Sequence, residues 1–231
     1  MSIDEAPVRR FRGRPPKLSA TQIIEAARDV LTELPAEAFA LGRVAERLGA
    51  PVTSLYNYFP NRFTLLAAVA ETLFTCFDFQ EPPPEMAWPD AVLAWLRALD
   101  AFFLDHPVAI KAIGVDDQTS PAWGSVRAPL LRQLRRAGFK GRDLAIAAMA
   151  THTQVVGLLF TAQYVLRPQP ADGVFPGADA SPIERDEAEL CSYRATIRRD
   201  DIVGLGLAAI VASLQQMADR AGLSVDNANH F

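Results

Sequence analysis

Cysteine is scarce in this chain, and its cysteines form neither a metal-binding nor a disulfide pattern. Of the 231 residues only Cys76 and Cys191 are cysteines, and they lie far apart in sequence. Zinc sites and disulfide scaffolds use several closely spaced cysteines or histidines. The amino end also lacks an apolar stretch of the length that a signal peptide needs. We therefore expect no metal site, no export, and two buried thiols in the reduced cytoplasm.

Patterns that indicate catalysis are missing as well. The sequence has no nucleophile elbow, no phosphate-binding loop and no pair of histidines at metal-ligand spacing. Gly204 and Gly206 lie inside a helical pattern rather than after a strand. No period-two alternation occurs, which predicts an all-α fold. We expect no enzymatic activity and no cofactor, and the open alternative is an all-α enzyme built from scattered residues.

The charge of the chain is unevenly distributed. The net charge of -4 and the pI of 5.4 argue against general binding of polyanions. Up to Arg62, however, the chain holds 9 basic and 7 acidic residues, whereas the remainder holds 14 and 20. The basic excess is densest in residues 8–17, which contain no acid. The amino end is therefore the expected contact with a nucleic acid.

Residues 1–18 are expected to form a flexible basic arm, because they combine Gly13 with Pro15 and Pro16 and lack apolar periodicity. Their RGRPPK segment resembles the core of an AT-hook. An extended Arg-Gly-Arg-Pro segment is thin enough to place Arg12 and Arg14 in the minor groove of A·T-rich DNA. The alternative is a solvated basic tail that only speeds the encounter with DNA. The sequence favours neither reading.

Residues 44–59 contain two short helical patterns separated by Gly49. A helix-turn-helix needs a three- to four-residue turn of this kind, in which glycine adopts positive φ without strain. Upstream, Ser19 and Gln22 form a capping box that starts a first helix, and Pro35 ends that helix. The apolar positions on either side of Gly49 are Val44, Ala45, Leu48, Val52, Leu55 and Phe59.

The segments VAERLG and LYNYF, with Arg62 three residues after the second, resemble the DNA-binding domain of TetR-family repressors over about residues 11–75. The resemblance implies a three-helix DNA-binding domain at residues 19–62 and a helical ligand-sensing and dimerisation domain at residues 63–231. It implies a cytoplasmic transcriptional repressor that binds a palindromic double-stranded DNA operator as a homodimer and is released by a small-molecule effector. The alternatives are an architectural protein that coats A·T-rich DNA through the RGRP arm, and a carrier or enzyme with a vestigial DNA-binding domain.

The resemblance also implies which side chains contact DNA. Thr53, Ser54 and Asn57 would reach base edges from the second helix of the motif. The residues implied for phosphate and backbone contacts are Tyr56, Tyr58, Arg62 and, from the preceding helix, Arg43.

Three departures from the family pattern leave the operator sequence open. Pro51 stands where Ser or Thr usually caps the second helix of the motif. Gly42 stands where an arginine often reaches a base. Phe63 and Thr64 replace the acidic pair that usually follows the base at position 62.

After Arg62 the apolar spacing predicts one helix to about Phe77, which the resemblance makes a lever between the two domains. Prolines at residues 82–84 stop it, and residues 167–182 are expected to form a long loop. Further helices are predicted at 90–105, 107–114, 121–137, 141–166, 183–195 and 200–221.

Residues 144–166 carry no charge and are long enough to span a bilayer. The polar run at 151–154 and Gln163 would be costly in hydrocarbon, so we expect a fully buried helix and no membrane. In the last helix, Gly204, Ala208 and Ala212 form a strip of small residues at helical spacing. Two long helices of this kind need the extra cover that a dimer supplies.

An effector site among the helices between residues 90 and 166 is implied by the resemblance. His152 and Gln163 are the stronger candidates, because a polar group on a buried helix needs a partner. A ligand, a hydrogen bond across the dimer or a buried water would each supply that partner. The candidate lining residues are Trp95, Phe102, Phe103, Trp123, Met149, His152, Thr153, Phe160 and Gln163.

Overall fold

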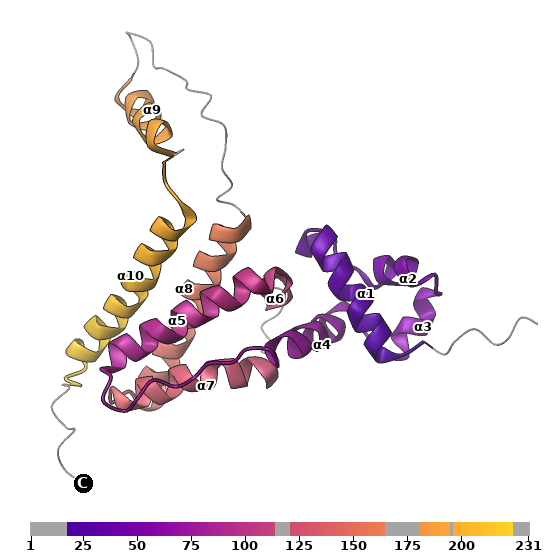
Figure 1. Ribbon diagram of the computed structural model, residues 1–231, viewed down its shortest axis with the longest axis horizontal. Coiled ribbons are helices and arrows are strands. Elements are labelled where there is room, and N and C mark those ends of the chain that lie inside the picture. Colours follow the sequence, from indigo (N-terminus) through magenta and orange to yellow (C-terminus); the bar gives the residue numbers. More distant parts are fainter. Residues whose placement is uncertain (1–17, 114–120, 165–180, 195, 224–231) are drawn as a thin grey trace, which may run out of the picture. The chain divides into compact units, whose positions relative to one another are not determined.

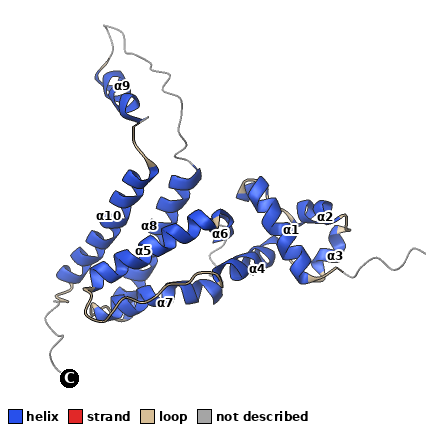
Figure 2. Ribbon diagram, in the orientation of Figure 1, coloured by secondary structure: helices blue, strands red, loops and turns tan. Residues whose placement is uncertain are grey.

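The computed structural model describes residues 18–113, 121–164, 181–194 and 196–223, in which every regular element is a helix (Figure 2). This confirms the all-α prediction. Nearly all of the basic arm, with Arg12 and Arg14, and most of the loop predicted at 167–182 lie outside the described residues. The chain divides into two compact units, one ending at Leu65 and the other beginning at Leu66.

The first unit is organised around α1 (Ala20–Glu33), which begins where the sequence predicts. The Gln22 N–H donates to Ser19 Oγ at 3.2 Å, and the Ser19 N–H donates to Gln22 Oε1 at 3.0 Å. These two bonds satisfy N–H groups that a helix start otherwise leaves unpaired. The buried face of α1 packs against α2 (Leu41–Leu48), which follows the short 3-10 helix η1 (Ala36–Ala38).

The turn between α2 and α3 (Val52–Tyr56) depends on Gly49. Its backbone has φ 60° and ψ 30°, the left-handed conformation that side chains disfavour. The Ala50 N–H donates to Ala45 O at 3.0 Å and so closes the end of α2. Val44 before the turn and Leu55 after it are both fully buried. The predicted helix-turn-helix geometry is therefore present.

Helix α4 (Arg62–Phe74) begins in the first unit and ends in the second. Asn61 and Thr64 cap its start reciprocally: the Thr64 N–H donates to Asn61 Oδ1 at 3.0 Å, and the Asn61 N–H donates to Thr64 Oγ1 at 3.4 Å. Thr64 thus takes the capping role usual for an acid at this position. The helix ends at Phe74 rather than at the predicted Phe77, because the chain tightens into a turn in which the Phe77 N–H donates to Phe74 O.

The second unit is a bundle in which α5 (Trp88–Asp105), α7 (Pro121–Arg136), α8 (Gly141–Tyr164) and α10 (Arg199–Arg220) pack together (Figure 1). The short α6 (Pro107–Ile113) contacts α5 and α8. Helix α9 (Pro182–Arg194) is exposed along its described length. The bounds of α5 to α10 agree with the helical patterns in the sequence to within a few residues.

Specific side chains fix the helices of the bundle to one another. The Trp95 indole N–H donates to Val126 O at 2.9 Å, which joins α5 to α7. Arg199 and Asp100 form a largely buried ion pair between α10 and α5. Between α8 and α10, a Cβ added at Gly206 would lie 2.5 Å from Leu158 Cδ2, so a larger residue at 206 would force the Leu158 side chain to move. These contacts set the spacing of the bundle.

Two burial predictions are wrong for the isolated chain. Cys76 and Cys191 are both exposed, because one lies in the turn after α4 and the other on exposed α9. Helix α8 is not fully buried: Ala147, Thr151 and Val155 are covered by the bundle, whereas Met149 on another face is 67% exposed. Neighbouring helices cover only one stripe of α8.

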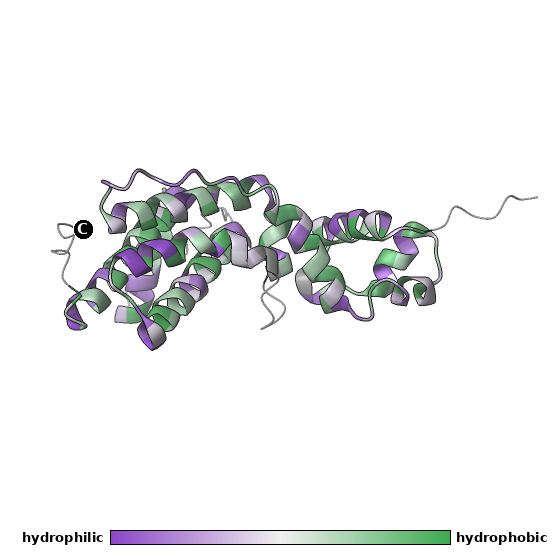
Figure 3. Cartoon of the chain, turned by 90° about the horizontal axis from the view of Figure 1, so that it is seen from below, coloured by the Kyte–Doolittle hydropathy of each residue, from purple (hydrophilic) through white to green (hydrophobic). Residues whose placement is uncertain are grey.

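Helices α8 and α10 are long and apolar enough to cross a membrane by length and composition alone. About a third or less of each apolar window is buried, namely 28% for α8 and 33% for α10. Figure 3 shows hydrophobic and hydrophilic residues interspersed on the helices of the chain. This test alone does not separate a membrane span from the core helix of a bundle.

Candidate DNA-binding surface and effector core

Helix α3 turns one apolar residue inward and polar residues outward. Leu55 is fully buried, whereas Thr53 and Asn57 are exposed and Tyr56 is 51% exposed. Ser54 is half-buried. The helix ends at Tyr56, so Asn57 caps it and does not lie within it as predicted. Because Pro51 supplies no side-chain cap, the orientation of α3 depends on Leu55 and the Gly49 turn.

The hydroxyl of Tyr58 is already engaged within the unit. It donates a hydrogen bond to the carbonyl oxygen of Leu18, the residue where the basic arm meets the described structure. Phosphate oxygens only accept hydrogen bonds, so this hydroxyl would have to leave Leu18 in order to donate to DNA. The contact instead places Leu18, the last residue of the arm, beside the segment that follows α3.

The arginines of the first unit differ in what they contact. Arg43 forms an exposed ion pair with Glu46 at 3.2 Å, and such pairs are weak and easily exchanged for another anion. The Arg62 guanidinium lies 5.0 Å from the centre of the Phe63 ring, at the start of α4. Arg47 donates to both carboxylate oxygens of Glu33 at 2.6 and 2.8 Å and so links α2 to α1.

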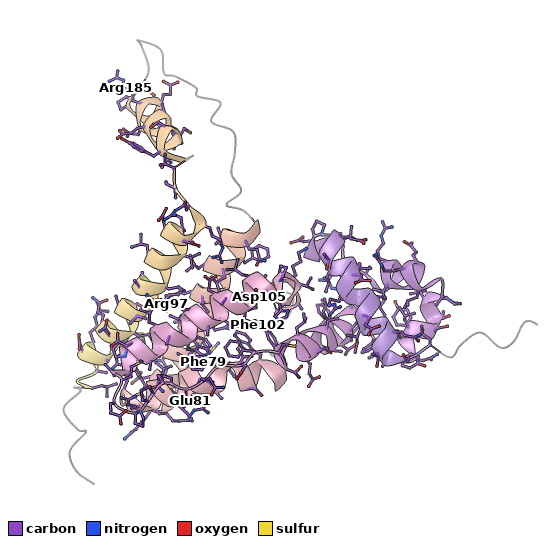
Figure 4. All side chains as sticks on the ribbon, viewed as in Figure 1. Phe79, Glu81, Arg97, Phe102, Asp105 and Arg185 are labelled. Atoms are coloured by element: carbon purple, nitrogen blue, oxygen red, sulfur yellow. The ribbon has the colours of Figure 1, made fainter. Side chains whose placement is uncertain are left out.

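In the second unit, side chains from four segments form a continuous aromatic cluster, made of Phe74, Phe77, Phe102, Trp123 and His152. Figure 4 labels Phe102 on α5, where it contacts both phenylalanines that end and follow α4, at centroid distances of 5.8 Å to Phe74 and 5.5 Å to Phe77. Trp123 of α7 lies 5.3 Å from Phe74 and 5.0 Å from the His152 ring of α8. These distances are typical of packed aromatic pairs.

One side of this cluster holds polar atoms without partners, which we call the donor cluster: Trp123 Nε1, Arg127 Nε and His152 Nδ1. All three are buried and make no hydrogen bond. Burial, followed by the positive charge of Arg127, lowers the pKa of His152 below its usual value of 6.5. Both influences favour the neutral form of His152. Buried polar groups in proteins normally have partners, so these three atoms are the candidates in this unit for contact with a bound molecule.

Only some of the residues predicted to line an effector site belong to the aromatic cluster. Phe102, Trp123 and His152 are its members among them. Trp95 and Phe103 are core residues of the bundle, each 1% exposed. Met149 and Thr153 are exposed on another face of α8, so neither lines a buried site within one chain.

The remaining two predicted residues, Gln163 and Phe160, lie in the last part of α8. The Gln163 side-chain amide donates to Phe103 O at 3.3 Å, so its polar group already has a partner within the chain. Phe160 is half-buried.

Sequence reasoning missed Phe74, Phe77 and Arg127 as members of this site. The two phenylalanines were predicted as the buried side of the helix after Arg62. Arg127 follows Trp123 by four residues, which places both on one face of α7. The four-residue spacing is the sequence signal that could have indicated Arg127 as a site residue. It indicates a buried site only once it is known that α8 covers this face of α7.

Comparison with known proteins agrees with this architecture. The family model described as "Bacterial regulatory proteins, tetR family" matches residues 23–69, which include α2 and α3. The tetracycline repressor protein class C of Escherichia coli is 28% identical over 218 residues, which are 87% of this chain and 92% of the relative.

Two solved structures show the same fold. ActR of Streptomyces coelicolor, in complex with actinorhodin, has a TM-score of 0.68 at 22% identity and covers 87% of this chain and 98% of its own. BioQ of Mycobacterium smegmatis, with its double-stranded DNA operator, has a TM-score of 0.56 at 21% identity and covers 78% of this chain and 99% of its own. Residues 23–69 thus match the model of the tetR family of bacterial regulatory proteins, and over most of its length the chain is similar to a tetracycline repressor.

Proposed function

We propose that this protein is a cytoplasmic, ligand-responsive repressor that binds a palindromic operator as a homodimer and leaves it when a small molecule occupies the second unit. The observation that carries the proposal is the α2–Gly49–α3 turn, which presents Thr53 and Asn57 outward on either side of buried Leu55. In this assignment residues 1–18 are a basic arm, 19–62 the DNA-binding domain, and 63–231 the effector and dimerisation domain. The 28% identity to a tetracycline repressor over most of both chains supports repression rather than activation.

Within the DNA-binding domain, Thr53 and Asn57 are exposed for base edges, and Ser54 contributes from a half-buried position. Tyr56 and Arg62 contact phosphates, and Arg43 joins them when its pair with Glu46 opens. Tyr58 positions the arm through Leu18. Arg12 and Arg14 then extend the contact into the minor groove. That BioQ is solved with its double-stranded operator supports this use of the fold.

The uncovered faces of α8 and α10 support dimerisation. Leu205 is 73% exposed and Met149 is 67% exposed, and both belong to helices whose other faces are buried. Gly204, Ala208 and Ala212 are exposed along α10, which allows another helix to approach closely. Covering these faces with a second copy removes apolar surface from water without requiring a membrane.

Effector release is proposed to act through α4. This helix starts at Arg62 in the DNA-binding domain and ends at Phe74 in the aromatic cluster. A ligand that shifts Phe74 therefore moves a continuous helix whose other end holds a DNA contact. The two DNA-binding domains of a dimer must match successive major grooves, so a small movement is enough to lower operator affinity. The complex of ActR with actinorhodin supports a small-molecule site in this fold.

The proposal is tested by selecting fragmented genomic DNA with the purified full chain at physiological salt. The Tyr56→Ala, Asn57→Ala double variant is selected in parallel, and Thr32→Ala, an exposed residue of α1, serves as the control for exposed substitution. We expect the wild type and the control to enrich one palindrome and the double variant to lose it. The logarithm of the affinity for that palindrome should fall with the logarithm of the salt concentration, with a slope of about -0.9 for each phosphate that a lysine or arginine neutralises.

Two outcomes would contradict the repressor. Broad enrichment of A·T-rich DNA by the wild type and the double variant alike would instead indicate an architectural protein acting through the RGRP arm. Ligand affinity that is unchanged by operator would indicate a carrier. In a regulator, effector and operator change each other's affinity by the same factor.

A further inference from the structure

The donor cluster restricts the chemistry of the molecule that occupies the second unit, an inference that rests on the proposed function. Trp123 is 2% exposed, yet its Nε1–H has no hydrogen-bond acceptor. An indole N–H is only a donor, and so is an arginine Nε–H. A molecule that satisfies Trp123 and Arg127 must therefore present acceptor atoms.

Charge favours an anion over a neutral acceptor. Among the described residues, no carboxylate forms an ion pair with Arg127, although Arg199, Arg132 and Arg47 each have one. Burial and the Arg127 charge both lower the pKa of the adjacent His152 and so favour its neutral form. Within the part of the chain that the structure describes, no carboxylate pairs with the positive charge of the donor cluster, and hydrogen bonds between charged groups are about twice as strong as neutral ones.

The shape of the surroundings is given by the aromatic cluster. Trp123 lies at tilted or edge-on angles to Phe74 and His152, at centroid distances of 5.3 and 5.0 Å. Phe102 adds a further ring against Phe74. Such rings favour a flat, apolar body next to the donors, because offset and edge-to-face packing are the preferred contacts of aromatic groups.

We propose that the effector of this protein is a planar aromatic acid, whose carboxylate accepts hydrogen bonds from Trp123 Nε1 and Arg127 Nε and whose ring packs against Phe74 and Phe102. His152, in the tautomer that carries hydrogen on Nδ1, donates a third hydrogen bond. The acid then lies against the last residue of α4.

The test measures binding to the full chain by calorimetry with benzoate, 2-naphthoate and 2-anthracenecarboxylate, each compared with its neutral carboxamide. The three ring sizes cover the unknown size of the effector. We expect at least one acid to bind tenfold or more tightly than its own amide. Failure of all three acids to bind, or equal binding of acid and amide, overturns the proposal.

Two variants test whether Arg127 and Trp123 are the donors that bind the acid, and whether Arg127 causes its preference over the amide. Arg127→Gln should weaken the acid tenfold or more and change the amide by less than threefold, whereas Trp123→Phe removes a donor that either ligand can use and should weaken both. Arg97→Gln, an exposed arginine on α5, is the matched control and should leave both unchanged. Undiminished binding of the acid to Arg127→Gln would contradict the assignment.

A third measurement uses only the wild-type chain and so does not depend on the folding of a variant. The pKa of His152, followed by NMR, should rise when the acid binds, because a neighbouring anion favours the protonated ring. A neutral amide should leave it unchanged or lower it further by burial. A fall with the acid would overturn the proposal.

Failure of the effector proposal and failure of the proposed repressor function would give different results. Enrichment of a palindrome without binding of any aromatic acid rejects the effector class alone. Binding of an acid without any enriched palindrome rejects the regulatory role and leaves the binding site standing.

Discussion

The two units of this chain place their polar side chains in opposite ways. In the first unit the polar groups with a proposed function, such as Thr53 and Asn57, are exposed and the buried residues are apolar. In the second unit the corresponding groups, Trp123 Nε1 and His152 Nδ1, are buried and have no partner. A DNA-binding surface gains its partners from a large ligand that arrives from outside. A buried binding site instead keeps its hydrogen-bond donors away from water, where the lower dielectric constant makes each hydrogen bond stronger.

The largest effects should come from truncating a core side chain in one unit at a time, which tests whether the two units unfold independently. Leu55→Ala in the first unit and Leu96→Ala in the second each remove a fully buried side chain, at a cost of roughly 2–5 kcal/mol. Hydrogen exchange should show faster opening only in the unit that carries the change. DNA affinity should fall for Leu55→Ala. Equal loosening of both units by either variant would mean that they unfold as one.

Gly49→Val should nearly abolish DNA binding while the second unit stays folded. No atom lies within 4 Å of an added Cβ, so the penalty comes from the backbone, where φ is 60°. A β-branched residue there costs about 1–3 kcal/mol. Gly49→Asn is the control, because asparagine tolerates this conformation. Operator affinity together with the melting of each unit decides the outcome, and full binding by the valine variant would refute the role of the turn.

Tyr58→Phe should lower operator affinity by a smaller amount. The variant tests whether Tyr58 positions the basic arm or contacts a phosphate. Losing the exposed hydrogen bond to Leu18 costs about 1 kcal/mol or less. If the hydroxyl only positions the arm, operator affinity falls slightly in the full chain and the variant has no effect once residues 1–17 are removed. If it contacts a phosphate, the loss persists without the arm, because that contact does not act through Leu18. Operator affinities of both proteins, measured with and without residues 1–17, distinguish these roles.

The smallest expected effect is a pH dependence confined to the second unit. The pKa of His152 is lower in the folded chain than its usual 6.5, so the unfolded chain takes up a proton first as pH falls. Stability of this unit is therefore greatest above pH 6.5 and declines as pH falls below it toward the folded pKa. His152→Gln should flatten this part of the profile, measured as melting temperature against pH. An unchanged profile would show that other groups cause the decline.

The same contrast explains what the sequence could predict. Ser19, Gly49 and Pro35 act through their own backbone, so α1 and the turn after α2 were predicted correctly. The donor cluster joins α7 to α8, and no local pattern shows that these faces meet. Arg127 was missed for this reason, and Met149 was included although it lies on the uncovered face of α8. The early end of α4 at Phe74 likewise depends on packing against Phe102 and Trp123.

The neutral cap at the start of α4 has an electrostatic consequence. Asn61 and Thr64 satisfy the backbone there without adding a negative charge, so the positive potential of the helix start is not cancelled and adds to that of Arg62. Neither cap residue nor the helix dipole carries a titratable group, so their contribution to the potential does not change over the pH range in which His152 changes its charge. A change of pH would therefore act on the second unit and leave the electrostatic contribution of the α4 cap unchanged.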